Sequence, residues 1–126
     1  MGTGRAVGNE VPEPDFVALV GPHDGQRRAL RDHLRALGFE VRELLSFEQA
    51  SIYTRVLVHV VGQVDRDLLS SMARFLDGTG RLVVITKALP AIRELTPSEP
   101  ERLRVLVPPV FPWQLRDALA IHAVAV

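Results

Sequence analysis

Apolar residues occur along the chain in two kinds of pattern. Short continuous runs, such as FVALV at residues 16–20, are typical of strands that are buried on both faces of a sheet. Longer stretches place apolar side chains every three or four positions, as an amphipathic helix does, and Leu30, Leu34 and Leu37 form one such set. The first pattern predicts strands at residues 16–20, 39–45, 55–61, 81–86 and 104–107.

The second pattern predicts that helices separate these strands. The expected helical stretches are residues 25–37, a short helix capped by Ser46 with Gln49 three positions on, residues 65–77, at most a short helix in 89–95, and residues 112–123. Gly38 is placed to end the first helix in the left-handed conformation. Strands that alternate with helices form right-handed βαβ units, with helices on both faces of a parallel sheet. We therefore expect an α/β fold of the flavodoxin-like (βα)5 type, a three-layer sandwich whose five strands have the order 2-1-3-4-5.

The length and composition describe one globular domain. The chain has 126 residues, of which 47% are hydrophobic, and that fraction is too high for a disordered chain. Residues 1–15 contain three Gly, two Pro and few apolar side chains, so we expect a disordered or extended linker there. The domain itself is expected at residues 16–126. A linker in front of it and an end inside a helix suggest a domain cut from a larger protein.

The charge balance and the absence of cysteine argue against several classes of function. Fifteen basic and fifteen acidic side chains leave no net charge, which argues against a nucleic-acid-binding surface. Without Cys there is no disulfide, no thiolate metal site and no Cys nucleophile. No apolar run approaches the ~20 residues that span a bilayer, and residues 1–15 lack the apolar core of a signal peptide. We therefore expect no membrane contact.

Three short segments, taken in their order along the chain, resemble those of a known family of domains. They are VALV at residues 17–20 with Arg27 and LGFEV at 37–41, then LVVIT at 82–86, then Pro109 six residues before Leu115. Together these segments resemble the receiver domain of bacterial response regulators over about residues 16–123. The resemblance implies a cytoplasmic domain of a two-component protein, such as a hybrid histidine kinase or a response regulator.

The residues that carry receiver phosphorylation are mostly missing. In that family two acids after strand 1 hold Mg²⁺, an Asp that ends strand 3 accepts phosphate, and a Ser or Thr after strand 4 and a Lys after strand 5 bind the phosphoryl oxygens. Here the acidic pair falls on Gly21 and Pro22, residues 56–64 contain no Asp or Glu, and the Lys position falls on Pro108. Only Thr86 remains. The resemblance thus implies a degenerate receiver, or pseudo-receiver, with no catalytic residue, no metal site, no cofactor and no enzymatic activity.

Arginines and the single tryptophan are the side chains best suited to binding. The leading candidates are Arg93, Arg102, Arg104 and Trp113. They fall around the fourth helix, the fifth strand and the fifth helix, the face that the resemblance implies for partner binding. Trp and Arg are enriched in binding hot spots, and Arg beside an aromatic ring can also pair with a nucleotide. Packing of Trp113 over the sheet edge is the alternative.

A second candidate surface is the basic strip on the first helix. Arg27, Arg31 and Arg35 recur there at i, i+4 and i+8. Such spacing suits docking to an acidic partner or to phosphate. A solvated face balanced by Asp32 is the favoured interpretation.

The remaining polar candidates have simpler explanations. Asp24 is the acid nearest to the missing metal pair, but helix N-capping is favoured. His23 could contact an anion at the helix N-terminus, and a solvated loop His is favoured. His59, inside the third strand, could act as a pH switch, and a satisfied core His is favoured. His33 and His122 lie on helices without ligand spacing to each other.

Two function hypotheses from different classes follow. The first is a docking module that holds a neighbouring domain of the same protein, or a signalling protein, in one arrangement until a partner or ligand shifts that equilibrium. The alternative is a small-ligand sensor that binds a second messenger such as cyclic di-GMP to control a neighbouring kinase, as the resemblance to some pseudo-receivers implies. A flavodoxin-like enzyme is disfavoured, because no nucleophile–base pair or acid pair lies at the predicted strand ends.

Overall fold

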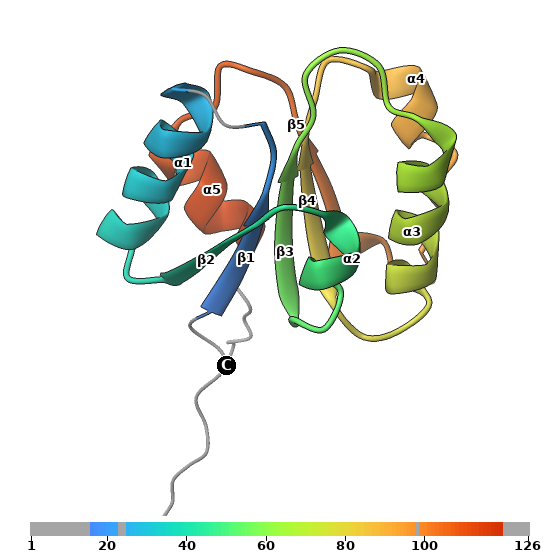
Figure 1. Cartoon of the computed structure of the whole chain (residues 1–126), viewed down its shortest axis with the longest axis horizontal. Coiled ribbons are helices and arrows are strands. Elements are labelled where there is room, and N and C mark those ends of the chain that lie inside the picture. Colours follow the sequence, from blue (N-terminus) through green and yellow to red (C-terminus); the bar gives the residue numbers. More distant parts are fainter. Residues whose placement is uncertain (1–15, 23–24, 98, 120–126) are drawn as a thin grey trace, which may run out of the picture.

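One parallel sheet of five strands runs through the centre of the molecule (Figure 1). The computed structural model describes residues 16–22, 25–97 and 99–119. The strands are β1 (Phe16–Val20), β2 (Glu40–Leu44), β3 (Arg55–His59), β4 (Arg81–Ile85) and β5 (Leu103–Leu106). Their order in the sheet is β2-β1-β3-β4-β5, and every neighbouring pair is parallel. The predicted flavodoxin-like fold class and strand order are therefore confirmed.

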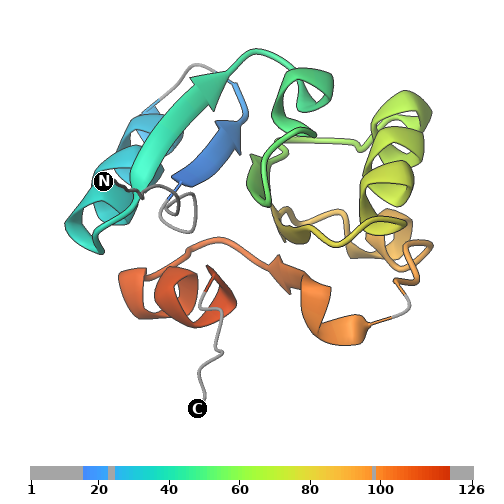
Figure 2. The ribbon, with the colours of Figure 1, turned by 90° about the horizontal axis from the view of Figure 1, so that it is seen from below.

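Helices cover both faces of this sheet. They are α1 (Gly25–Ala36), α2 (Phe47–Ala50), α3 (Arg66–Leu76), α4 (Leu89–Ile92), the 3₁₀ turn η3 (Pro100–Arg102) and α5 (Pro112–Leu119). α1 and α5 lie on one face, and α2, α3 and α4 lie on the other (Figures 1 and 2). The sheet is thus the middle layer of a three-layer sandwich.

Two separate apolar clusters form the core, one on each face of the sheet. Leu19 of β1 packs in one cluster with Leu34 of α1. Its neighbour in sequence, Ala18, packs in the other cluster with Met72 of α3. Successive strand residues point to opposite faces, so a strand covered on both sides needs apolar residues at every position. This requirement explains the continuous apolar runs in the sequence.

Two predicted local signals are confirmed by the backbone. The Ser46 hydroxyl accepts a hydrogen bond from the Gln49 N–H at 3.3 Å and so caps α2. Gly38 follows α1 with a φ of 102°, a conformation that side-chain-bearing residues rarely adopt. These short-range features fix where α1 ends and α2 begins.

The elements differ from the predicted ones mainly at their ends. β3 ends at His59, two residues earlier than predicted, and Gly62 then turns the chain with a φ of 86°. The expected linker at residues 1–15 and the end of the last helix, residues 120–123, lie outside the described residues. Within the part of the chain that the structure describes, no helix is both long and apolar enough to cross a bilayer.

Candidate functional site

The carboxyl ends of the five strands meet at one edge of the sheet, and this edge is where sites form in folds of this type. Gly21 and Pro22 follow β1 there, beside the end of β3. A Cβ atom placed on Gly21 would lie 3.1 Å from the Cβ of His59 and 3.1 Å from its carbonyl oxygen. A side chain at Gly21 would therefore be in tight contact with His59, which would have to shift by a few tenths of an ångström. Glycine avoids this tight contact where β1 ends beside β3.

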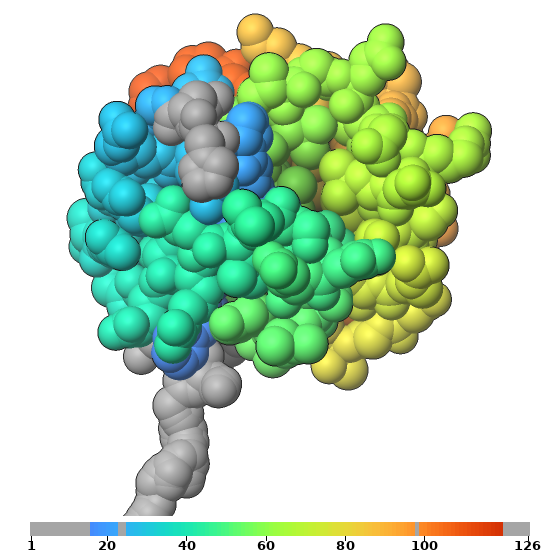
Figure 3. All heavy atoms as spheres, in the orientation of Figure 1, coloured from blue at the N-terminus to red at the C-terminus, as the bar shows by residue number. Residues whose placement is uncertain are grey.

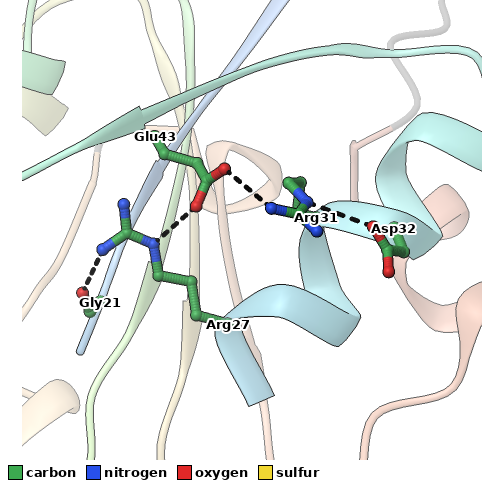
Figure 4. Close-up of polar contacts among 5 residues, drawn as sticks. All are labelled: Gly21, Arg27, Arg31, Asp32 and Glu43. Carbon is green, nitrogen blue, oxygen red and sulfur yellow. Dashed lines mark hydrogen bonds and ion pairs between the residues drawn. The ribbon is translucent and has the colours of Figure 1, made fainter. Parts of the chain in front are cut away.

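A guanidinium group lies beside Gly21. Arg27 of α1 is buried, with only 5% of its side chain exposed. Its Nη1 donates to the Gly21 carbonyl oxygen at 2.9 Å, and its Nε donates to Oε1 of Glu43 on β2 at 3.1 Å (Figure 4). The guanidinium thus occupies the space beside Gly21 and is paired there with a carboxylate. An Arg side chain has no acceptor atom with which to ligate a metal ion.

The predicted basic strip on α1 is not one continuous surface. Arg27 points inward, whereas Arg31 donates to Glu43 at 3.5 Å and to Asp32 at 3.2 Å (Figure 4). The hydrogen bond to Asp32 raises the pKa of the Arg31 guanidinium above its ordinary value. Arg35 is exposed in the last turn of the helix. The pairing of Arg31 with Asp32 agrees with the balanced-face interpretation of this strip.

The one phosphorylation-type residue that remains, Thr86, is fully buried. Its hydroxyl accepts a hydrogen bond from the Ala88 N–H at 3.0 Å, which closes the turn between β4 and α4. Across the edge, Pro108 and Pro109 follow β5 and are joined by a cis peptide bond. Thr86 therefore has a structural role in the turn, and no Lys stands at the strand 5 position.

Arg102, predicted as a binding residue, is instead a structural one. It is 7% exposed and lies at the amino end of β5. Its guanidinium donates to the carbonyl oxygens of Leu76 at 2.6 Å and Gly80 at 2.9 Å, and its Nε lies 3.3 Å from Oε1 of Glu99. Leu76 is the last residue of α3, so its carbonyl is one that the helix itself leaves without a partner, and Gly80 lies in the loop before β4. The prediction placed Arg102 on a surface, and the structure places it in the interior.

The other three leading candidates do not form one cluster either. Arg104 pairs with Asp117 of α5 at 2.9 Å, while Leu103 and Val105 beside it face the opposite cluster. Arg93 is exposed at the end of α4 and lines a groove with those two residues. Because neighbouring strand positions point to opposite faces, Arg104 and Arg93 lie on different sides of β5.

Trp113 is 61% exposed at the start of α5, so the alternative of packing over the sheet edge does not hold for this side chain. Four more large apolar side chains are exposed at the same edge: Leu45 at 76%, Val61 at 62%, Val107 at 45% and Phe111 at 53%. We name these five residues the carboxyl-edge patch. Sequence reasoning missed it, although the run VPPVFPW at residues 107–113 is a visible signal of apolar loop residues.

Two histidines that are distant in sequence line one hollow beside this edge. His33 of α1 and His59 of β3 line a hollow of about 200 Å³ together with Pro108, Pro109 and Ile85. His59 is 4% exposed, in agreement with the favoured core interpretation. His23, Asp24 and His122 lie outside the described residues. Among residues 16–22, 25–97 and 99–119, no group of three or more potential metal ligands occurs.

Comparisons with known proteins find relatives among solved structures but no family. No family model matches the chain, and no curated protein matches it. A crystal structure described as a "Putative pilus assembly-related protein" from Burkholderia pseudomallei matches with a TM-score of 0.61 and 18% sequence identity. The match covers 89% of this chain and 92% of that chain. At this identity the likeness concerns the fold, and this chain shares its flavodoxin-like α/β architecture with that protein.

Proposed function

We propose that this chain is a receiver-like domain that does not accept phosphate and that acts by docking to a partner. The observation that carries the proposal is that the carboxyl edge of the sheet lacks the acidic residues of receivers and has other residues in their place. Where the resemblance to receivers calls for acids, the structure has Gly21, the buried Arg27 guanidinium and exposed apolar side chains. An edge of this kind favours contact with another surface over phosphoryl transfer.

The carboxyl-edge patch has the composition of a protein-binding surface. Aromatic side chains such as Trp113 and Phe111 supply large contact areas and act as anchors in interfaces. In the described loops of this edge, residues 21–22, 45–46, 60–65, 86–88 and 107–111, the only charged side chains are Asp65 and Lys87. Asp65 caps α3 by accepting from the Leu68 N–H at 2.8 Å. An apolar, weakly charged patch on a surface marks an interaction site.

The proposed partner is a neighbouring domain of the same protein or a separate signalling protein. The receiver resemblance supports a two-component protein as the parent. The Burkholderia pseudomallei relative is described as related to pilus assembly, which is consistent with a module that works through protein contacts. In both settings the domain positions a partner and performs no chemistry on it.

Site-specific photo-cross-linking in the native cell tests the docking proposal. A photoreactive phenylalanine analogue at Phe111 or Trp113 is expected to form one defined adduct, because both side chains belong to the patch. The same analogue at Arg35, which is exposed near the opposite edge of the sheet, is expected to form none. The purified partner is expected to bind Trp113→Ala at least about tenfold more weakly than the unmodified chain. Equal affinity for both, or an equal adduct from Arg35, contradicts the proposed surface.

A second candidate function is the small-ligand sensor. A hollow of about 430 Å³ between α2 and α3, far from the carboxyl edge, favours it. This volume falls within the ~300–1,000 Å³ that is usual for small-molecule sites. The two candidates use different surfaces, so a ligand at one does not exclude a partner at the other.

A further inference from the structure

The hollow between α2 and α3 has its own set of binding groups. It lies at the amino edge of the sheet, where the loop at residues 51–54 meets the end of α3 and the loop at residues 78–80. Figure 3 shows α2 and the 51–54 loop in green beside the yellow end of α3 on one face of the molecule. Nothing in the receiver resemblance assigns a role to this place.

Aromatic rings form the apolar part of the hollow. Phe47 of α2 and Phe75 of α3 contact edge to face, with ring centroids 5.6 Å apart and an interplanar angle of 82°. Tyr53, which is partly buried, lines the same space. A Cβ atom on Gly80 would overlap the Phe75 ring, so a larger residue there would displace this ring. Phe47 is buried beneath this space, and the exposed parts of Phe75 and Tyr53 offer a planar group a surface on which to stack.

One cation with unused donors lines the hollow. Arg74 of α3 is exposed, and within the described structure its contact is a hydrogen bond of 3.5 Å to the Ser71 hydroxyl on the same helix. Most of its five N–H donors are therefore available to a ligand. Thr54 and Thr79, which carry hydroxyl groups, line the same space. A guanidinium with nearby hydroxyls suits the oxygens of a phosphate group.

One carboxylate lines the hollow as well. Glu48 of α2 is exposed, and it forms no ion pair with Arg74 within the described residues. An ionised carboxylate only accepts hydrogen bonds, so it selects a base that presents neighbouring N–H donors. Guanine presents its ring N1–H and its amino group side by side, whereas adenine presents an acceptor beside its amino group. A carboxylate that contacts a bound base favours guanine over adenine for this reason.

From these groups we infer that the hollow binds a guanine nucleotide. The base stacks on the aromatic surface and donates to Glu48, while the phosphate pairs with Arg74. Ile52, which is 83% exposed at the rim of the hollow, covers part of the bound base and so loses exposure. A guanine base together with one phosphate is present both in GMP and in each half of cyclic di-GMP, so either could be the ligand. The inference gives the sensor function a site, and it does not depend on docking at the carboxyl-edge patch.

Calorimetric titration of the purified full chain with GMP and, separately, with cyclic di-GMP tests this inference. At least one of them is expected to bind. If GMP binds, AMP is expected to bind at least about tenfold more weakly because it lacks the guanine base. Guanosine is expected to bind at least about tenfold more weakly than GMP because it lacks the phosphate. If cyclic di-GMP binds more tightly than GMP, the dinucleotide is the preferred ligand of the hollow.

Matched variants locate the bound nucleotide. Arg74→Gln is expected to weaken binding at least about tenfold, and Glu48→Gln is expected to remove the preference for guanine over adenine. Arg66→Gln, an exposed change on the same helix outside the hollow, is the control and is expected to bind as the unmodified chain does. The inference is wrong if neither nucleotide binds at millimolar concentration, or if Arg74→Gln binds as tightly as Arg66→Gln. Neither result bears on cross-linking from Phe111 or Trp113, which tests docking separately.

Discussion

Replacing Arg102 by Gln is expected to lower the free energy of unfolding by about 2–4 kcal/mol. The shorter side chain cannot reach the carbonyl oxygens of Leu76 and Gly80, to which Arg102 donates at 2.6 and 2.9 Å. Two buried acceptors then lose their charged donor, and each such loss costs about 1–3 kcal/mol. Urea unfolding followed by circular dichroism measures the change.

The matched control for Arg102 lies two residues further along the chain. Arg104→Gln removes the ion pair with Asp117, whose two side chains are 41% and 67% exposed. An exposed pair of this kind contributes about 0–1 kcal/mol, so a much smaller change in stability is expected. If the two variants lose the same stability, the structural role assigned to Arg102 is incorrect. If Arg102→Gln weakens partner binding without loss of stability, the original surface assignment of Arg102 is restored.

Replacing Arg27 by Gln is expected to cost about 2–3 kcal/mol of folding stability. The change leaves the Gly21 carbonyl oxygen without its guanidinium donor and leaves Glu43 without its buried partner. Glu43 keeps 30% of its side chain exposed, so water offsets part of the loss and the cost falls below that of a fully buried pair. Thermal and urea unfolding of the variant measure the change.

A double-mutant cycle with Glu43→Gln separates the ion pair from the other contacts of Arg27. The cost of both changes together is expected to be clearly smaller than the sum of the single costs, because either single change already removes the Arg27–Glu43 ion pair. Arg35→Gln, on the exposed last turn of the same helix, serves as the control and is expected to change stability by no more than about 0.5 kcal/mol. Strict additivity of Arg27→Gln and Glu43→Gln would show that the pair does not couple α1 to β2.

The fold could be predicted because its signals are short-range and agree with one another. The continuous run in β1 requires cover on both faces, and Gly38 and Ser46 mark one helix end and one helix start. Each of these features involves residues only a few positions apart. A chain with such consistent local signals and this alternation of strands and helices has few topologies open to it.

The candidate site was less predictable because its contacts are long-range. Arg102 bonds to carbonyls that lie 22 and 26 residues earlier in the chain, so nothing near it in sequence shows whether it is buried. His33 and His59 line one hollow only because a crossover brings α1 beside the end of β3. The hollow between α2 and α3, which Arg74 lines, likewise exists only because these two helices pack side by side. A pattern of residue types cannot supply such distances before the fold is known.

Exposure to acetyl phosphate and Mg²⁺, followed by measurement of the intact mass, tests most directly whether this edge of the sheet has lost phosphoryl transfer. A receiver with its full set of acids serves as the positive control in the same reaction. The unmodified mass is expected to persist, because residues 56–64 offer no carboxylate and the Arg27 guanidinium lies beside Gly21. A stoichiometric, base-labile gain of one phosphoryl group would contradict the account and make this chain a working receiver.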